Sequence, residues 1–599
     1  MSIAKDGTST WRFDIALALL ATLGFLAVNA SAGFPALIDA GGDNDNLLRL
    51  VEVRDLLAGQ GWFDLHQYRM GLEGGFVMHW SRLVDAPIAA IVLAVSKLTG
   101  NTTLAENVAQ VAWPALLFGL TMVFIIRTAR GFAGNGAVLP VIVVGAAALY
   151  FIGIFTPGAL DHHNVQLMLT VASLSFLIEA RMRRPAAWLA GLCAALTLAI
   201  GMETAPYVAA IGVCVSALFV LDGSGEKLIA RDFGFGLAGV STLVFVTTIP
   251  ISAWGQVKCD AFSTVQFVVA ALAGIGLAAT TSIEAAGRTR GRRLISLGLL
   301  GIVLGAALLS LFPQCLASPY TGLDPRLKTL WLDHIDEAQS LFQLAARHPA
   351  ELAARYVTPL VAIVLMASRL THDSWRRQDS LVAVLLVVAF LVSVWQVRGS
   401  TFSIAFAVIP LAAWIAKWRQ RAETSPSRSS VLRMAAAWLV SINSIWSGAA
   451  EAAAAALETG AKTTKDAGAD PSCHAKATFA ALGRMPGTTV LAVSNLGSPI
   501  LMYSRHRVFA GPYHRNVAGD LLALDAFLGS EAQARSIVGD HHVGLVALCR
   551  GNPESQLLAF TVPDGFLAGL MRGHVPEWLE PIAETRGAAL ELYRVRPNS

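Results

Sequence analysis

Three short stretches of the sequence bring acidic and imidazole side chains together at spacings that suit metal binding. The first is Asp43-Asn44-Asp45, which is followed by Arg49. Two carboxylates two positions apart can share a hard cation through their oxygens. The same residues could instead cap a helix, since Asp and Asn are common immediately before one. The stretch by itself leaves both interpretations open.

The second stretch is Asp161-His162-His163, directly before an apolar run. A carboxylate and an imidazole two positions apart can hold a divalent metal ion. The alternative is again a cap for the helix that follows. A second histidine beside the first favours metal binding over the cap.

A third acidic stretch and an isolated cation complete the set. His334-Ile335-Asp336-Glu337 could contribute carboxylates or form one side of a solvated amphipathic helix. Arg398 ends an apolar run, where it could snorkel toward the interface or bind a phosphate group. Carboxylates, imidazoles and an arginine together could hold a metal ion against a phosphate leaving group and activate a nucleophile.

The elements that must position these residues are predicted to be membrane helices. Of 599 residues, 55% are hydrophobic and 14% are charged, against about 25% charged residues in soluble domains. This composition excludes a soluble enzyme and a disordered chain, and a net charge of +4 indicates no nucleic-acid partner. Apolar runs long enough for the bilayer core predict a mostly α fold with about thirteen spans, at 12–36, 105–127, 135–154, 163–181, 186–202, 204–221, 233–253, 262–281, 294–312, 351–369, 379–396, 400–416 and 430–448.

The basic residues decide the orientation. A further apolar run, 86–99, is shorter and follows Asp85, so it could span or lie along the interface. If it does not span, arginine and lysine concentrate in the loops on the N-terminal side, and the short loops on the other side hold only Lys258 and Arg398. Positive loops stay in the cytoplasm, so we expect a cytoplasmic N-terminus and an external C-terminus. The first apolar run, 12–36, lacks an evident signal-peptide cleavage site, and we expect it to be retained as a membrane helix.

This topology divides the chain into two expected domains. Residues 1–449 would form the membrane domain, with outer loops 37–104, 155–162 and 313–350, and residues 450–599 a small soluble α/β domain. All the candidate residues then fall on the outer face, although the topology was deduced from basic residues alone.

Within the C-terminal domain we expect a helix over the Ala-rich stretch 451–462 and short strands. The strands are predicted over the apolar runs 488–495, 499–504 and 543–549. The polar-aromatic segment Tyr513-His514-Arg515-Asn516 could bind a ligand or form a strand-ending turn. If the outer compartment is oxidising, four external cysteines could form disulfides or remain free thiols; the pairs are Cys259–Cys315 and Cys473–Cys549.

At this point the chain resembles the catalytic subunit of the oligosaccharyltransferases, which are polytopic GT-C glycosyltransferases. That family has thirteen spans, a cytoplasmic N-terminus and a soluble C-terminal domain on the outer side. Its first outer loop carries a catalytic Asp followed six positions later by Arg, as Asp43 and Arg49 are here. Its second outer loop carries an acidic motif whose archaeal form is matched by Asp161-His162-His163.

Two later motifs extend the resemblance over about residues 10–450. A T-I-x-E motif of the family is matched by His334-Ile335-Asp336-Glu337, with His in place of Thr. The family also uses an arginine in the following helices to contact the lipid-linked phosphate, and Arg398 stands at a matching place.

The resemblance implies a transferase that moves a sugar or oligosaccharide from a polyprenyl-phosphate or polyprenyl-pyrophosphate donor to an acceptor, at the periplasmic face of a bacterial inner membrane. It implies Mg²⁺ or Mn²⁺ as cofactor and inversion at the anomeric centre. The residues it assigns are Asp43, Asp161, His163 and Glu337 as metal ligands, Asp43, Arg49, Asp161 and Glu337 as catalytic groups, Arg398 for the donor phosphate, and His162 and Asp45 as supporting residues. Arg49 would orient Asp43.

One family feature is missing. The family reads its protein acceptor with a Trp-Trp-Asp motif at the start of the C-terminal domain, whereas the only tryptophan after residue 450 is Trp578. The acceptor therefore stays open among a glycan, a lipid and a protein, and the donor sugar, partner subunits and oligomeric state are not predicted. His79, Trp80 and Arg82 could line the donor groove or anchor the loop at the interface.

The alternative to a transferase is a transporter or flippase for lipid-linked glycans, or a non-catalytic membrane scaffold. Transporters are built from paired halves with broken helices, and they hold their substrate near the bilayer midplane. The sequence has no such pairing, and its charged candidates lie at the outer mouth, which favours chemistry.

Overall fold

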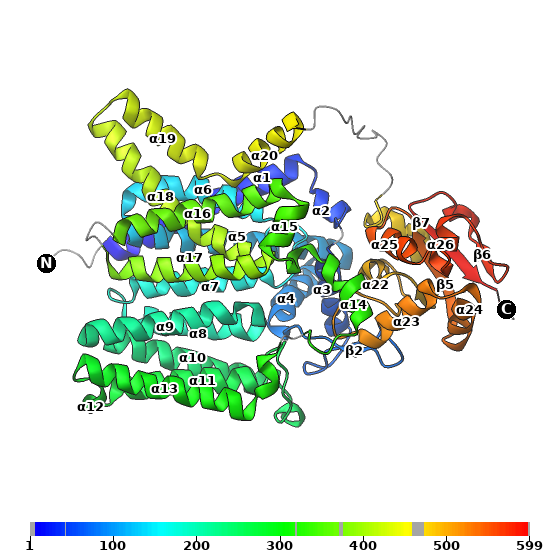
Figure 1. Cartoon of the computed structure of the whole chain (residues 1–599), viewed down its shortest axis with the longest axis horizontal. Helices are drawn as coiled ribbons and strands as arrows, with labels where there is room; N and C mark the ends of the chain where they lie inside the picture. Colours follow the sequence, from blue (N-terminus) through cyan, green and yellow to red (C-terminus); the bar gives the residue numbers. More distant parts are fainter. Residues whose placement is uncertain (1–5, 42, 318–319, 371–374, 458–471, 597–599) are drawn as a thin grey trace.

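The computed structural model describes residues 6–41, 43–317, 320–370, 375–457 and 472–596. Long helices run side by side in a bundle, and a smaller mixed unit lies at one end of it (Figure 1). The bundle helices are α1 Asp6–Ser31, α5 Thr102–Ala133, α6 Val138–Ile152, α7 His163–Glu179, α8 Arg184–Ile200, α9 Ala205–Asp222, α10 Lys227–Thr248, α11 Thr264–Ser282, α12 Glu284–Gly287, α13 Arg290–Leu311, α16 Pro349–Leu370, α17 Arg377–Trp395, α18 Ser400–Thr424, α19 Arg428–Val440 and α20 Asn443–Leu457.

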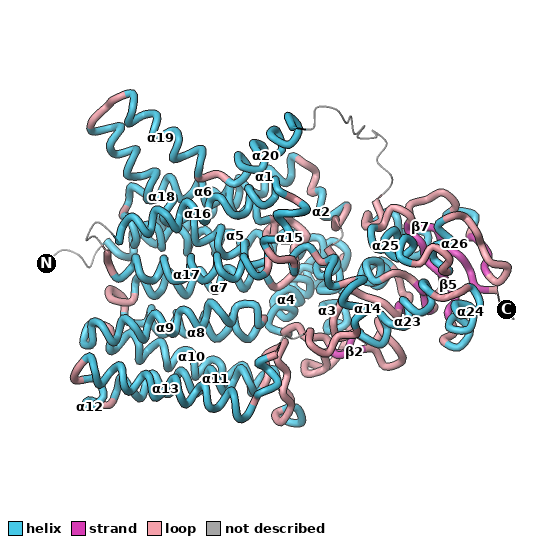
Figure 2. The backbone as a smooth tube through the Cα atoms, in the orientation of Figure 1, coloured by secondary structure: helices cyan, strands magenta, loops and turns pink. Residues whose placement is uncertain are grey.

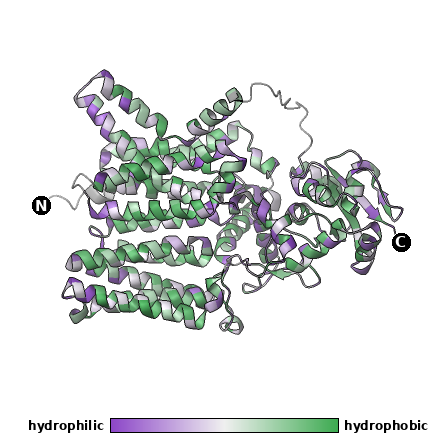
Figure 3. Cartoon of the chain, viewed as in Figure 1, coloured by the Kyte–Doolittle hydropathy of each residue, from purple (hydrophilic) through white to green (hydrophobic). Residues whose placement is uncertain are grey.

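The bundle is that of a membrane protein. Within the described residues, 10 helical segments are long and apolar enough to span a bilayer, and hydrophobic residues dominate these helices along their length (Figure 3). Helices α7 and α8, at 17 residues each, are shorter members of the same bundle. Helix α4, Arg82–Thr99, which contains the run 86–99, is not among the spanning segments. The prediction of a mostly α, polytopic membrane protein is confirmed.

The last predicted span, 430–448, differs from expectation because it is divided into α19 and α20. Helix α19 ends at Val440, and Asn443 begins a new helix. The buried Asn443 side chain donates to the Ala354 carbonyl and to Thr358 Oγ1, both at 2.8 Å. These bonds to α16 satisfy a polar group that would be costly in an apolar environment. Residues 458–462 of the predicted Ala-rich helix lie outside the described residues.

Buried ion pairs join the helices at the end where the arginines concentrate. Asp14 of α1 is fully buried and accepts from Arg127 at 3.0 Å and from Arg130, both on α5. Glu226 accepts from Arg377 of α17 at 2.6 Å. A buried carboxylate is tolerated when it is paired and hydrogen-bonded, so these contacts stabilise the bundle opposite the candidate site.

The outer loops fold into small elements between the bundle and the C-terminal unit. The first loop contains α2 Pro35–Ile38, α3 Asn44–Leu57, β1 His66–Gln67, β2 Phe76–Val77 and α4. The loop between α13 and α16 contains α14 Pro325–Leu330 and α15 Leu341–Arg347. Helix α3 packs against both α4 and the C-terminal unit, so it connects the membrane bundle to the outer layer.

The C-terminal unit is a small α/β structure built on one five-stranded sheet with strand order β4-β3-β5-β7-β6 (Figure 2). Strand β3 is parallel to β4 and β5, and β7 is antiparallel to β5 and β6. Its elements are α21 Ala480–Gly483, β3 Thr489–Leu491, α22 Gly497–Tyr503, β4 Arg507–Val508, α23 Val517–Leu528, α24 Glu531–Asp540, β5 Val543–Cys549, α25 Pro553–Thr561, α26 Phe566–Met571, β6 Leu579–Pro581 and β7 Leu590–Val595.

One of the three predicted strands is wrong. The runs 488–495 and 543–549 contain β3 and β5, but 499–504 lies mostly in helix α22. A short apolar run cannot be assigned by periodicity alone, because a buried helix and a buried strand look alike over such a length. Pro499 lies in the first turn of the helix, where a proline needs no hydrogen-bonded N–H.

The C-terminal unit is bonded directly to the first outer loop. Gly71 N–H donates to the Val508 carbonyl and Val508 N–H donates to the Arg69 carbonyl, each at 2.9 Å, so the loop adds a bridge beside β4. Arg54 of α3 donates to the Met502 carbonyl at 2.7 Å. The loop that carries Asp43 is therefore held between the bundle and the C-terminal unit.

Candidate active site

Asp43 caps helix α3, and the cap fixes the direction of its carboxylate. One carboxylate oxygen accepts the N–H groups of Asp45 at 3.1 Å and Asn46 at 3.3 Å. The other accepts the Asn46 side-chain amide at 2.6 Å. The two interpretations of this stretch are compatible, because the capping carboxylate also lines a cavity.

Asn46 connects Asp43 to the second acidic stretch. Its side-chain oxygen accepts the backbone N–H of Leu160 at 2.7 Å and of Asp161 at 2.8 Å. The amide nitrogen of the same side chain bonds Asp43. One half-buried amide thus connects the first and second outer loops.

Asp161 bonds both neighbouring imidazoles. His162 Nδ1 lies 2.5 Å from one of its carboxylate oxygens, and His163 Nδ1 bonds the other. The metal-ligating atoms of the three residues lie within 4.8 Å of one another. Helix α7 begins at His163 without a side-chain cap, so the Asp161 carboxylate is directed at the histidines and not at the helix end.

The residues present fit a divalent cation. His163 Nε2 is buried and has no hydrogen-bond partner in the described part of the chain. Its Nδ1 is held by a carboxylate, which is the arrangement that orients a histidine ligand through its other nitrogen. The carboxylates of Asp43, Asp161 and Glu337 line the same cavity as His163 and supply the oxygen ligands that Mg²⁺ and Mn²⁺ prefer.

The charges around Asp43 also suit a divalent cation. Burial, and then the negative charge of Asp161, raise the pKa of Asp43 from 3.8 to about 6. Burial, Asp161 and Asp43 together raise the pKa of Asp45. Asp43 is exposed toward the cavity that it lines together with Asp161 and Glu337, so negative charge gathers there. Burial alone would raise the pKa of Asp161, but His162 and His163 hold it well below its usual range.

Arg49 is a buried ion-pair partner, and its contacts differ from the expected role. It is completely buried, donates to Asp85 at 2.7 Å, and lies 3.9 Å from Asp161 and 3.4 Å from His162 Nδ1. Its guanidinium lies 4.1 Å above the ring of Trp80. These bonds connect Arg49 to Asp161, whereas we expected it to orient Asp43.

Glu337 and Arg398 come from neighbouring short turns. Glu337 lies in the turn Asp336–Ala338 of the loop between α13 and α16, and Arg398 in the turn Val397–Gly399 between α17 and α18. The Val397 N–H donates to the Gln339 carbonyl at 2.8 Å, which holds the two turns together. Arg398 Nε is buried without a partner among the described residues, so a donor is available for an anion.

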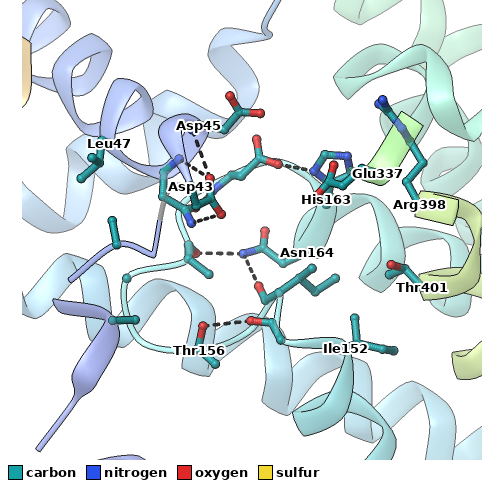
Figure 4. A pocket seen from close by; sticks show the side chains of 18 of the residues that line it. Asp43, Asp45, Leu47, Ile152, Thr156, His163, Asn164, Glu337, Arg398 and Thr401 are labelled. Atoms are coloured by element: carbon teal, nitrogen blue, oxygen red, sulfur yellow. Dashed lines mark hydrogen bonds and ion pairs between the residues drawn. The ribbon is translucent and has the colours of Figure 1, made fainter. Parts of the chain in front are cut away.

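Two cavities meet at these residues. The smaller, of about 300 Å³, is also lined by parts of α2, α16 and α18; the larger, of about 1010 Å³, extends between α9, α17, the loop after α13 and the C-terminal unit. Figure 4 shows Glu337 and His163 beside each other, with Asp43 on one side of them and Arg398 on the other. The residues common to both linings are Asp43, Asp45, His163, Glu337 and Arg398. Two ligands could therefore approach the same polar groups from different sides.

His79, Trp80 and Arg82 lie inside the protein and not at an interface. Trp80 is 3% exposed and lines the larger cavity with His79. Arg82 is buried and pairs with Asp85 at 3.0 Å. His79 and Trp80 are therefore placed to line the groove, whereas Arg82 belongs to a buried ion pair.

The tail segment 513–516 also belongs to this region. Tyr513 and His514 line the larger cavity. His514 lies 2.7 Å from Asp260, and Arg515 donates to the same carboxylate at 2.8 Å. Trp578, in contrast, is buried in the C-terminal unit against Phe566 and does not line either cavity.

Both cysteine pairs are disulfides in the structure. Cys259 and Cys315 join the loop after α10 to the loop after α13, with Cα atoms 5.2 Å apart. Cys473 and Cys549 lie 6.0 Å apart and link the start of the C-terminal unit to β5.

Sequence reasoning missed four polar residues that shape the site. Asp85, Glu203 and Asp260 are single polar residues without a motif around them, and Asn46 directly follows the stretch Asp43-Asn44-Asp45. The available signal was position: Asp85 interrupts the start of an apolar run, and Glu203 stands between the predicted spans 186–202 and 204–221. An ionisable residue at the end of a span deserves a functional hypothesis.

The fold and the site define a polytopic membrane protein with a polar, metal-compatible centre at the end of the bundle that adjoins the C-terminal unit. No protein-family model matches the sequence, and no curated protein sequence matches it. Solved structures do. The oligosaccharyltransferase AglB of Archaeoglobus fulgidus, in complex with an inhibitory peptide and a dolichol-phosphate, aligns with a TM-score of 0.64 at 14% identity over 92% of this chain and 71% of that chain.

Two further structures of the Archaeoglobus fulgidus enzyme agree. The form tethered to an acceptor peptide containing the NVT sequon gives a TM-score of 0.65 at 15% identity over 98% of this chain and 74% of that one. The complex with Zn and sulfate gives 0.59 at 14% identity over 92% and 70%. The chain therefore shares its overall fold with this archaeal oligosaccharyltransferase, as the resemblance implied.

Proposed function

We propose that this chain is a metal-dependent glycosyltransferase that moves a sugar or oligosaccharide from a polyprenyl-phosphate or polyprenyl-pyrophosphate donor to an acceptor. The observation that carries the proposal is the convergence of Asp43, His163, Glu337 and Arg398 on the boundary of two cavities. A transferase needs two substrates to meet at one set of groups, whereas a scaffold needs none.

The larger cavity is the better site for the donor. Its wall includes residues of the spanning helices α9, α17 and α18, so a lipid-anchored group could reach it from the bilayer. Its volume of about 1010 Å³ is at the upper end of the range of about 300–1,000 Å³ for ligand pockets. The smaller cavity would then receive the reacting end of the acceptor.

Each residue at the boundary has a role that follows from its chemistry. Asp43, held by its cap, would accept a hydrogen bond from the acceptor nucleophile and orient it. Arg398 would bind the donor phosphate through its unpartnered guanidinium nitrogen. Asp161, His163 and Glu337, with Asp43, would hold Mg²⁺ or Mn²⁺, which supplies positive charge beside the leaving phosphate. Arg49 and His162 would keep Asp161 in place.

The neighbours support the substrate classes but leave the acceptor open. Structures of the archaeal enzyme include a dolichol-phosphate and an acceptor peptide with the NVT sequon. A polyprenyl-phosphate donor is the corresponding class here. We assign no acceptor, because the Trp-Trp-Asp motif is missing and Trp578 is buried away from the site.

The test is transfer of a labelled sugar from a native membrane lipid extract by the purified protein. We expect transfer with Mn²⁺, its loss in EDTA, and its loss in the double variant Asp161→Ala/His163→Ala. His66→Ala is the matched control, because His66 is an exposed histidine of the first outer loop outside both cavities. No transfer by the wild-type protein, with lipid-linked sugar still bound by the double variant, would contradict the proposal and favour transport.

We further propose that the site faces the periplasm of a bacterial inner membrane, with the N-terminus in the cytoplasm. The supporting observation is that both disulfides lie on the site's side of the bundle, as expected for an oxidising compartment. A C-terminal fusion to alkaline phosphatase should be active and a fusion to green fluorescent protein dark. The reverse result would invert the topology.

A further inference from the structure

Glu203 is a carboxylate of the larger cavity that the proposed roles do not use. It lies in the turn Met202–Thr204 between α8 and α9, and its side chain is 28% exposed. The exposed part faces the cavity that also contains Arg398 and His163. A carboxylate at this depth is expensive to keep without a purpose.

The structure holds Glu203 in one orientation. Its Oε2 accepts the Nε2 amide of Gln166 at 3.0 Å, and Gln166 is completely buried on α7, one turn after His163. Its Oε1 lies 3.9 Å from His162 Nε2, which is longer than a hydrogen bond. One oxygen is therefore fixed by the protein, and the other can accept a hydrogen bond from a ligand in the cavity.

The surroundings of Glu203 suit a sugar. Tyr207, one turn further along α9, stacks on Phe402 of α18 with ring centroids 4.3 Å apart, and both rings line the cavity beside it. Both rings are nearly completely buried, at 1% and 4% exposure, so they form a closed apolar wall beside Glu203. The fixed carboxylate is the group that can accept a hydrogen bond from a sugar hydroxyl, and a bond to a charged acceptor is a strong one. Arg398 lines the same cavity and would bind the phosphate to which the sugar is attached.

We propose that Glu203 is a specificity-determining residue that recognises a hydroxyl group of the donor sugar next to the lipid-linked phosphate. This inference rests on the proposed function. It assigns to the donor a free hydroxyl in contact with Glu203 Oε1. A site built to bond a hydroxyl rejects an analogue that lacks it far more strongly than an apolar pocket distinguishes two shapes.

The experiment compares donors that differ by one hydroxyl. Purified wild-type protein and Glu203→Gln would be given undecaprenyl-phosphate-linked glucose and its 2-, 3-, 4- and 6-deoxy analogues, and both binding and transfer would be measured. We expect the wild type to disfavour one deoxy donor by about tenfold or more, since bonds to charged groups are the stronger ones. In Glu203→Gln that preference should be lost, while transfer from the disfavoured deoxy donor should be unchanged.

Two controls separate this role from a structural one. Glu203→Gln keeps a partner for Gln166, and Glu73→Gln makes the same charge change at an exposed position of the first outer loop outside both cavities. Glu73→Gln should retain the wild-type donor preference. An unchanged preference in Glu203→Gln, or an equal loss of turnover with every donor, would overturn the assignment. If the wild type binds and transfers none of these donors and also transfers no label from the native lipid extract, the proposed function fails and the assignment with it; transfer from the extract with equal use of every deoxy donor overturns the assignment alone.

Discussion

The side-chain oxygen of Asn46 accepts the backbone N–H of Asp161 at 2.8 Å. This bond joins the first outer loop to the second, and the nitrogen of the same amide holds Asp43 at 2.6 Å. The two acidic stretches, more than a hundred residues apart in the chain, are therefore held together by one half-buried side chain.

Replacing Asn46 should impair transfer more than folding. In Asn46→Ala both loops lose this amide, so we expect transfer to fall by at least about tenfold, because each lost bond is worth roughly 1 kcal/mol. Asn101→Ala is the control: Asn101 caps α5 from an exposed position, and its loss should cost about 1 kcal/mol of stability with normal transfer. Equal transfer by the two variants would contradict the connecting role of Asn46.

The buried pair of Arg49 and Asp85 should dominate the stability of the first outer loop. Arg49→Met removes one of the two arginines that pair with Asp85 among the described residues and leaves Arg82, and we expect a loss of about 3 kcal/mol, because removing one partner from a buried ion-pair cluster is destabilising. The double variant Arg49→Met/Asp85→Asn should regain part of this stability. It should not regain transfer, since Asp161 still lacks its contact with Arg49. Thermal unfolding and transfer assays measure the two effects. Full recovery of transfer would exclude a role for Arg49 at Asp161.

The stability of the metal-free protein should depend on pH through Asp43. Its pKa rises from 3.8 to about 6 on folding, so the folded state holds the proton more tightly than the unfolded state does. Stability from this group is highest below 3.8, falls as pH rises to about 6, and stays low above it.

Asp43→Asn isolates this effect, because Asn caps a helix as well as Asp does. In EDTA we expect the Tm of the wild type to fall relative to the variant between pH 4 and pH 6. Added Mn²⁺ should restore the wild type above pH 6, since a ligand that binds only the folded state stabilises it. If Tm changed with pH in the same way in the two proteins, the raised pKa of Asp43 would be contradicted.

Breaking the disulfide Cys259–Cys315 should loosen the loop that carries Glu337. The bond closes 56 residues and joins that loop to the segment containing Asp260. We expect Cys259→Ser/Cys315→Ser to lose about 2–4 kcal/mol, together with transfer and protease resistance of residues 320–350.

The other disulfide is the matched comparison. Cys473→Ser/Cys549→Ser should destabilise the C-terminal unit while leaving the 320–350 loop resistant to protease. Limited proteolysis followed by mass spectrometry locates the cleavage sites. Cleavage of that loop in both variants would show that the disulfide Cys259–Cys315 does not specifically stabilise it.

The class of fold can be predicted from the sequence without any tertiary contact. Apolar runs of this length become helices in a bilayer, because a helix satisfies the hydrogen bonds of its own backbone there. The clustering of arginine in alternate loops then predicts on which side of the membrane each candidate falls. Asp161-His162-His163 could be identified because its three residues are adjacent in the chain.

Which distant residues meet depends on the tertiary structure. Asp85 and Glu203 carry no local pattern, Asn46 stands beside a motif that does not reveal its partner, and the roles of all three depend on contacts between different loops and helices. The contacts of Arg49 with Asp85 and Asp161 could not be predicted for the same reason, since a long side chain six positions from Asp43 can reach several carboxylates. The helix α22 at 497–503 was mistaken for a strand because short apolar runs carry no period. Hydrophobic patterning specifies elements, whereas the directions of polar side chains are set by packing that the linear sequence does not reveal.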